Sequence, residues 1–309
     1  MNSPLSLQNI RHQIDQIDDE IHDLLMRRAD LVLEIAEEKK KSGLPIIQPA
    51  REIKTLRRLM TRHRGVLQKQ AVLQIWRELV GAVCLLQKDL RAVLYTPHLH
   101  SHEDVGAHDL TYDFAYNLAY DLAHAYLGTL FPLDSQSDIH SLISQLAAGD
   151  YECAILPYDP VQSHSPSNHW WRYFIDFKKA APESTASPAN SAIYITQKLP
   201  ITARPSENPQ AFLLTSGGFH ASGDDYSILA CESLSAAPNT SEQPPKSPSL
   251  AMLREKLGFS DLQLFSFDEL SIIVVHEFVD KGDTRIQQAR NHGFELTLLG
   301  GYPAPIETD

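Results

Sequence analysis

The sequence predicts a multidomain fold, in which an all-α three-helix unit (residues 1–91) precedes an α/β region (92–210) and a C-terminal α+β unit (211–309). Two observations lead to this prediction. Apolar residues recur every three or four positions through the first ninety residues, which is typical of amphipathic helices. Beyond residue 91, short apolar runs typical of strands alternate with helical segments. The chain is also longer than a usual single domain, which favours several units.

The first helix is predicted over residues 6–42, roughly 50 Å of helix. Ser6 can cap its N-terminus, and Gly43 with Pro45 ends it. Its apolar stripe consists of Ile10, Ile14, Ile17, Ile21, Leu24, Leu25, Leu31 and Ile35. Such a helix is too long for a compact monomeric domain of this size. We therefore expect the unit to complete its core by pairing with a second copy.

Two further helices follow in the N-terminal unit. One begins at Pro49 and ends near Gly65, and the other is expected over residues 69–90 with Trp76 and Val83 on its apolar face. In the middle region we expect strands at 92–95, 152–156 and 192–196 and helices at 113–130 and 139–148. Ser/Pro/Ala-rich stretches at 182–190 and 234–249 are predicted to be linkers or long loops.

The last third alternates regularly. It reads as a strand at 227–231, a helix at 250–257, strands at 262–267 and 271–279, a helix at 284–291 and a strand at 295–299. This order of strand, helix, strand, strand, helix and strand is typical of a ferredoxin-like unit.

Composition excludes several classes of protein. The chain is 43% hydrophobic and 21% charged, as in soluble globular proteins. It has no apolar run long enough for a membrane span and no signal-peptide core, and its three separated cysteines indicate a cytoplasmic protein without disulfides. The net charge is −12, although the first 91 residues carry more Lys and Arg than Asp and Glu. This imbalance favours a small anionic ligand over nucleic acid.

No cofactor or metal site is predicted. His98, His100 and His102 alternate, but no carboxylate or cysteine pattern completes a metal site, and a solvated loop explains them better.

Cations on the first helix have a spacing that suits a ligand. Arg28 and Lys39 are 11 residues apart, which places them within about 20° of one face and about 16 Å apart along the axis. Arg11 lies about 25 Å before Arg28 and cannot reach the same ligand within its own chain. In an antiparallel dimer, Arg11 of one chain could enter the partner's site.

The N-terminal unit resembles the all-helical (AroQ class) chorismate mutases. The resemblance covers residues 5–90, through I-R-H-Q-I-D-Q-I-D, L-L-M-R-R-A-D-L-V, K-K-K-S-G-L-P-I, P-A-R-E, and I-W-R-E-L followed by L-L-Q. It implies an intertwined homodimer, held through the N-terminal helices, that converts chorismate to prephenate in two shared sites.

The resemblance also implies roles for individual residues. Arg11 from the partner and Arg28 would hold the two carboxylates of chorismate, and Lys39 and Gln87 would donate to the ether oxygen that is breaking. Glu52 would accept from the substrate hydroxyl, and Arg51 would support the pocket and a carboxylate.

Two substrate-binding positions depart from the family pattern. Gln48 stands where an Asp is common, and Val83 stands where a small hydroxyl residue is frequent, so affinity for the substrate is expected to be lower. Arg27 is an alternative to Arg28 by position, but the spacing to Lys39 and Arg11 favours Arg28.

The rest of the chain has weaker resemblances. Residues 139–157 resemble a helix and strand of prephenate dehydratase, but the Thr-Arg-Phe triplet of that family is absent, which indicates a degenerate dehydratase-like domain. The segments S-I-I-V-V-H-E-F-V-D and L-L-G-G-Y-P resemble an ACT domain, which implies an aromatic amino acid as an effector; a dimerisation or stability module is the alternative.

Three functions are therefore compared. The first is a chorismate mutase of aromatic amino acid biosynthesis, regulated through its C-terminal unit. The second is a bifunctional chorismate mutase/prephenate dehydratase. The third is a non-catalytic, amino-acid-sensing dimer, against which the intact set of Arg11, Arg28, Lys39 and Gln87 argues.

Overall fold

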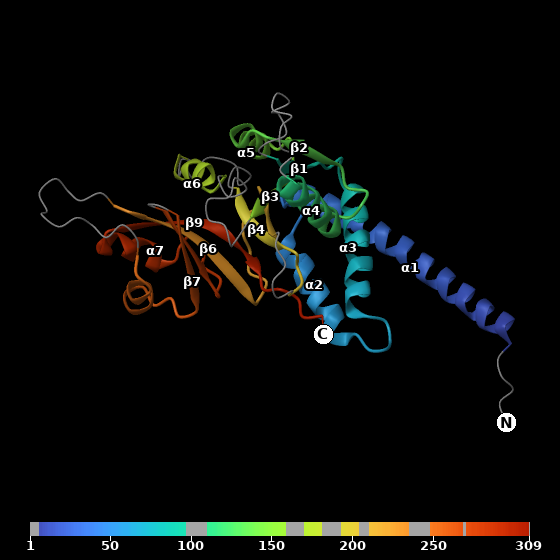
Figure 1. Ribbon diagram of the computed structural model, residues 1–309. Coiled ribbons are helices and arrows are strands. Elements are labelled where there is room, and N and C mark those ends of the chain that lie inside the picture. The colour runs from blue at the N-terminus through green and yellow to red at the C-terminus, as the bar shows by residue number, and fades with distance from the viewer. Residues whose placement is uncertain are drawn as a thin grey trace, which may run out of the picture.

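The computed structural model describes residues 6–96, 110–158, 170–180, 193–203, 210–234, 248–267 and 270–308. Figure 1 shows a long helix that extends away from a body in which helices cover a twisted sheet. The linker predicted at 182–190, most of the one at 234–249, and His98, His100 and His102 lie outside the described residues.

The N-terminal unit consists of the three helices that the periodicity predicts. They are α1 (Leu7–Ser42), α2 (Pro49–Arg62) and α3 (Lys69–Leu85). The hydroxyl of Ser6 caps α1 by accepting from the N–H of Asn9, and Gly43 ends the helix with a left-handed φ of 63°. The expectation that α3 continues to residue 90 is wrong. The chain turns after Leu85 and carries Leu90 into the core beside the first strand, where it is fully buried.

The α/β region contains β1 (Ala92–Tyr95), α4 (Leu110–Leu127), β2 (Leu133–Gln136), α5 (Ile139–Ala148) and β3 (Cys153–Tyr158). It continues through α6 (Trp170–Ala180), β4 (Tyr194–Leu199) and β5 (Gln210–Thr215). Strand β1 pairs in parallel with β2 and β3, whereas β5 pairs antiparallel with β3 and β4. β2, α6 and β5 are elements that the sequence patterns did not predict.

The C-terminal unit contains β6 (Asp225–Ser233), the short π-helix η3 (Met252–Lys256), β7 (Leu262–Phe267) and β8 (Leu270–Val275). It ends with α7 (Thr284–Gln288), the 3-10 turn η4 (Ala289–His292) and β9 (Phe294–Pro303). Strand β6 pairs antiparallel with β8 and β9, and β7 with β8. The predicted sequence of strands and helices is therefore present, although β8 ends at Val275 rather than at residue 279.

The described strands form a single mixed sheet in the order β2-β1-β3-β5-β4-β9-β6-β8-β7. The middle and C-terminal regions join at β4 and β9, which share the parallel pair Ile195 and Gly300. The domain division at residue 210 stays a prediction, and β5 begins at this point and pairs with strands of the middle region.

Alternate strand residues divide the core between the two faces of the sheet. Val93 and Tyr95 pack in the cluster that contains α5 and α6, whereas Ala92 and Leu94 pack with α2, α3 and α4. A third cluster lies between the C-terminal strands, η3 and α7. The helical unit is thus fixed to the sheet through α2 and α3. At Gly81 of α3 the backbone of Leu127 at the end of α4 is so close that a Cβ would clash with its carbonyl.

Candidate functional site

The long helix α1 exposes most of its apolar stripe in the single chain. None of its residues is buried, and the large side chains of Ile10, Ile14, Ile17 and Ile21 are exposed. A contiguous apolar surface of this length is unusual for a monomer and marks a binding face. Figure 1 shows the N-terminal part of α1 projecting from the body, and Arg11 belongs to the first turns of this helix.

Arg28 and Lys39 lie on the side of α1 that faces the body of the protein. Both are half-buried, whereas Arg27 is exposed. The ammonium of Lys39 donates to the carbonyl of Ile46 at 2.8 Å. Among the described residues, Nη1 of Arg28 is buried without a hydrogen-bond partner. Burial lowers the pKa of both groups.

Glu52, near the start of α2, is held by two neighbours that the sequence patterns did not identify. Its Oε2 is 2.7 Å from Nη1 of Arg77 and accepts from the hydroxyl of Tyr126 at 3.1 Å. Its Oε1 accepts from the backbone N–H of Gln48 at 3.3 Å. The carboxylate is therefore fixed in orientation before any ligand arrives.

Arg77 joins the helical unit to the α/β region. It is 3% exposed, its Nε and Nη2 donate to the carbonyl of Tyr126 at the end of α4, and its guanidinium lies 3.9 Å from the centre of the Tyr126 ring. A sequence signal for it exists, because Arg77 lies on the buried stripe of α3 with Leu73, Gly81 and Cys84. An arginine on a buried stripe requires an anionic or carbonyl partner.

Cys84 marks the point on which these charges converge. Burial, and secondarily Glu52, raise the pKa of its thiol while Lys39, Arg77 and Arg28 lower it, and the net result is a pKa of about 12. The thiol is therefore protonated at neutral pH and is a poor nucleophile. Because the charges of Arg28, Lys39 and Glu52 all act on the Cys84 thiol, these three side chains lie near one another between α1, α2 and α3.

Gln87 lies in the turn after α3, not within the helix as expected. Its Nε2 donates to the carbonyl of Val83 at 3.3 Å, and its buried Oε1 has no partner among the described residues. To donate to a ligand, this amide must turn away from Val83. Val83 itself is buried and offers no hydrogen bond from its side chain.

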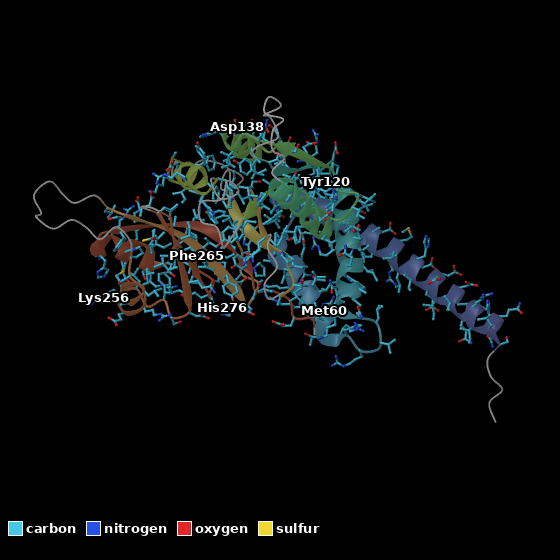
Figure 2. All side chains as sticks on the ribbon, viewed as in Figure 1. Met60, Tyr120, Asp138, Lys256, Phe265 and His276 are labelled. Atoms are coloured by element: carbon cyan, nitrogen blue, oxygen red, sulfur yellow. The ribbon has the colours of Figure 1, made fainter. Side chains whose placement is uncertain are left out.

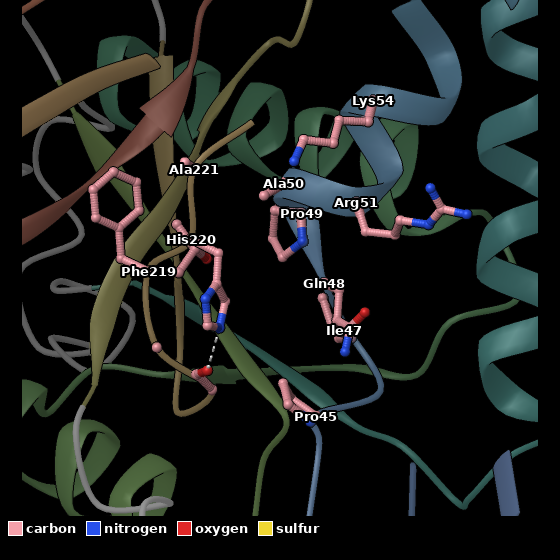
Figure 3. Close-up of a pocket in the computed structure, with 13 residues that line it drawn as sticks. Pro45, Ile47, Gln48, Pro49, Ala50, Arg51, Lys54, Phe219, His220 and Ala221 are labelled. Carbon is pink, nitrogen blue, oxygen red and sulfur yellow. Dashed lines mark hydrogen bonds between the residues drawn. The ribbon is translucent and has the colours of Figure 1, made fainter. Parts of the chain in front are cut away.

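Gln48 and Arg51 line a different hollow. It has a volume of about 260 Å³ and lies between the start of α2 and the loop 217–221 (Figure 3). The guanidinium of Arg51 points away from His220 on the far side of this hollow. The structure thus brings together Arg28, Lys39 and Glu52, places Gln87 beside Val83 and Cys84, and leaves Arg51 and Arg11 apart in the single chain.

The chemistry available at this cluster is binding and charge stabilisation. An unpartnered guanidinium nitrogen, a half-buried ammonium and an oriented carboxylate can hold a dianion that also carries a hydroxyl. Within the described part of the chain, no group of three or more His, Cys, Asp and Glu side chains could hold a metal ion. The same part contains no helix with the length and apolar character to cross a bilayer.

The fold and this cluster define a helical unit with a cation-lined site for a small anion. Residues 10–88 match the family model of chorismate mutase type II. The N-terminal region of the chain is therefore similar to chorismate mutase type II domains over these residues.

A curated relative matches in the same part of the chain. The bifunctional chorismate mutase/prephenate dehydratase of Aquifex aeolicus (strain VF5) is 35% identical over 95 residues, which cover 29% of this chain and 26% of the relative. The chain thus spans about a quarter of the length of the relative that it matches.

Two solved structures have low similarity to the fold. The prephenate dehydratase of Streptococcus mutans aligns with a TM-score of 0.34 at 13% identity and covers 70% of this chain and 100% of its own. The quorum-quenching acylase GqqA aligns with a TM-score of 0.35 at 13% identity and covers 70% of this chain and 95% of its own.

Proposed function

We propose that the protein is a chorismate mutase of aromatic amino acid biosynthesis, which converts chorismate to prephenate in two sites shared between the chains of a homodimer. The observation that carries the proposal is the match of residues 10–88 to chorismate mutase type II together with the convergence of Arg28, Lys39 and Glu52. The buried free thiols Cys84, Cys153 and Cys231 fit a cytoplasmic location.

The reaction is a rearrangement within one molecule and requires neither a nucleophile nor a proton transfer. The protein must hold chorismate in its compact reactive conformer and stabilise negative charge that develops on the ether oxygen. Arg28 would bind one carboxylate with its free nitrogen, which relieves the cost of an unpaired buried donor. Lys39 has further N–H groups besides the one bonded to Ile46, and one of them would donate to the ether oxygen.

The remaining roles follow from the residues around that pair. Gln87 would turn from the carbonyl of Val83 to donate to the same ether oxygen. Glu52, oriented by Arg77 and Tyr126, would accept from the substrate hydroxyl. Arg51, whose tip points away from the hollow beside loop 217–221, would support the second carboxylate.

Pairing of two α1 helices supplies what the single chain lacks. The exposed stripe of Ile10, Ile14, Ile17 and Ile21 would be covered by the partner, and burial of each such side chain contributes about 1.5–3 kcal/mol. In an antiparallel pair, Arg11 would come from the partner and complete the carboxylate clamp. Gln48 and Val83 contribute less to binding than the usual residues at their positions.

The C-terminal unit is proposed to be an ACT-like regulatory domain with an aromatic amino acid effector. The antiparallel strand order β9-β6-β8-β7, with helices after the first and third strands in sequence, supports a ferredoxin-like topology. The region between is proposed to be a degenerate dehydratase-like domain.

The disappearance of chorismate, followed by absorbance with the purified chain, tests the function. Enzyme-dependent loss of chorismate with formation of prephenate is expected. Absence of turnover would favour the non-catalytic sensing dimer. Accumulation of phenylpyruvate from prephenate would establish the bifunctional alternative, and none is expected.

A further inference from the structure

The hollow between α2 and loop 217–221 lies beside a closely packed junction. Gly217 lies so near the ring of Pro45 that a Cβ at this position would clash with it. Arg57 of α2 ties the two parts together, since it donates to the Ser222 hydroxyl at 3.0 Å and to the carbonyls of Asp224 and Ala304 at 2.9 and 2.8 Å. The hollow is thus a feature of a fixed interface between the mutase domain and the sheet.

The lining of the hollow combines an apolar wall with positive charge. Pro45, Ile47, Pro49 and Phe219 supply apolar surface, and Pro49 and His220 face each other across it (Figure 3). The ammonium of Lys54 extends from α2, and none of the described residues that line the hollow is a carboxylate. The N-terminus of the 14-residue helix α2 also borders it, and the cap residue Gln48 makes no side-chain capping bond. These features together favour an anion with an apolar body.

One wall of the hollow also belongs to the candidate mutase site. Pro45, Ile47 and Gln48 line the hollow, and the residue between them, Ile46, accepts the hydrogen bond from Lys39. The backbone N–H of Gln48 donates to Glu52. Of the residues assigned to the mutase site, Gln48 and Arg51 also line the hollow, whereas Arg28, Lys39, Glu52 and Gln87 do not. A molecule in the hollow would therefore touch the segment that positions Lys39 and Glu52 without occupying their site.

We propose that this hollow binds a small monocarboxylate with a ring-sized apolar body, and that its occupancy changes the affinity of the mutase site for chorismate through residues 45–48. The volume of about 260 Å³ is slightly below that of most small-molecule sites, which limits the ligand to about a dozen heavy atoms. Binding of the monocarboxylate to the hollow does not depend on the proposed function, whereas its effect on the affinity for chorismate rests on that function.

Calorimetric titration of the full-length chain with 3-phenylpropanoate, and with the uncharged 3-phenylpropanamide as a control, tests the binding. Saturable binding of the carboxylate is expected, with the amide about three- to fivefold weaker, the loss expected of an ion pair with the exposed Lys54. Lys54→Met should raise the Kd of the carboxylate about three- to fivefold, because it removes an exposed cation, and Ala221→Trp should abolish binding by filling the hollow. Lys256→Met removes an exposed lysine outside the hollow (Figure 2) and should leave the Kd within about twofold.

Each of the other outcomes would overturn the proposal. If 3-phenylpropanoate gives no saturable heat up to about 10 mM, the site is ruled out. A Kd above this concentration corresponds to a binding free energy of less than about 3 kcal/mol. An unchanged Kd in both Lys54→Met and Ala221→Trp would place the carboxylate elsewhere. Lys39→Ala should bind the probe like the wild type, and loss of binding in that variant would show that the probe occupies the mutase site instead.

The coupling between the hollow and the mutase site is tested by enzyme kinetics. In the wild type, saturating 3-phenylpropanoate should change the KM for chorismate at least about twofold, and in Lys54→Met it should not. An equal change in both proteins would contradict the coupling. If the wild-type protein binds the probe but does not consume chorismate, the binding site is confirmed and the proposed function is refuted.

Discussion

Replacement of Arg77 by methionine is expected to destabilise the protein by about 3–5 kcal/mol, the cost of breaking a buried ion pair on one side. Arg77 and Glu52 are only 3% and 11% exposed, and their charged atoms are 2.7 Å apart. Methionine fills much of the space but leaves the Glu52 carboxylate without its cation and the carbonyl of Tyr126 without its donors. Neither group is exposed enough to be fully hydrated instead.

The free energy of unfolding would be measured by urea denaturation at fixed protein concentration, because the chain is expected to dimerise. Arg91→Met is the matched control. The pair of Arg91 with Asp134 is of similar length, 2.6 Å, but its side chains are 54% and 34% exposed. Its loss should cost less than about 1 kcal/mol. If Arg77→Met also lowers the free energy of unfolding by less than about 1 kcal/mol, burial does not make the ion pair of Arg77 with Glu52 important for stability.

Three further changes follow from individual contacts. Lys39→Ala should lower kcat for chorismate about 100- to 1,000-fold with an unchanged circular dichroism spectrum, because it removes charge stabilisation from the reacting oxygen; a decrease of only twofold would contradict that role. His276→Gln should destabilise the protein mainly at low pH. The hydrogen bond to Asp224, at 2.8 Å, raises the pKa of the imidazole, so its stabilisation is present below about pH 6.5 and is lost as the pH rises through the raised value. The effect should stay below about 1 kcal/mol because the side chain is 35% exposed, and a difference independent of pH in urea denaturation would exclude it. Lys178→Met should raise the Tm, by an amount that is largest below pH 7 and shrinks toward pH 10. Burial, and secondarily the charge of Lys281, lower the Lys178 pKa to about 7, so the folded state is penalised wherever the unfolded amine is charged; a lower Tm at pH 6.5 would disprove this.

The helical unit could be predicted from sequence because its signals are local. The apolar period, Ser6 and Gly43 are sufficient to define α1. The spacing of Arg28 and Lys39 likewise places both on one face of one helix, and both turn toward the body of the protein.

The missed elements have weak local patterns. Strand β2 (Leu133–Gln136) reads L-D-S-Q, and only its parallel pairing with β1 makes it a strand. Helix α6 (Trp170–Ala180) begins with two tryptophans, and both are buried against the sheet. β5 (Gln210–Thr215) is an uninterrupted apolar run, and such a short run does not distinguish a central strand from other buried segments.

In the candidate site, too, local features could be predicted from sequence, whereas contacts between distant segments could not. Residues on one helix could be placed by their spacing, but the partners of Glu52 could not. Tyr126 lies 74 positions from Glu52 in the chain and reaches it only because α4 packs against α3. The hollow beside Lys54 likewise needs the loop at 217–221, which no local pattern connects with α2.

The most direct test of the proposed shared site mixes two inactive variants. Arg11→Ala and Lys39→Ala should each have little mutase activity alone, since each removes a cation from every site of its homodimer. After subunit exchange, half of the chains in a random mixture form heterodimers, and each heterodimer has one intact site. The mixture should recover up to about a quarter of wild-type activity, because random pairing leaves about a quarter of all sites intact. If activity stays at the level of the single variants although exchange is demonstrated, Arg11 does not act across the interface and the shared site is refuted.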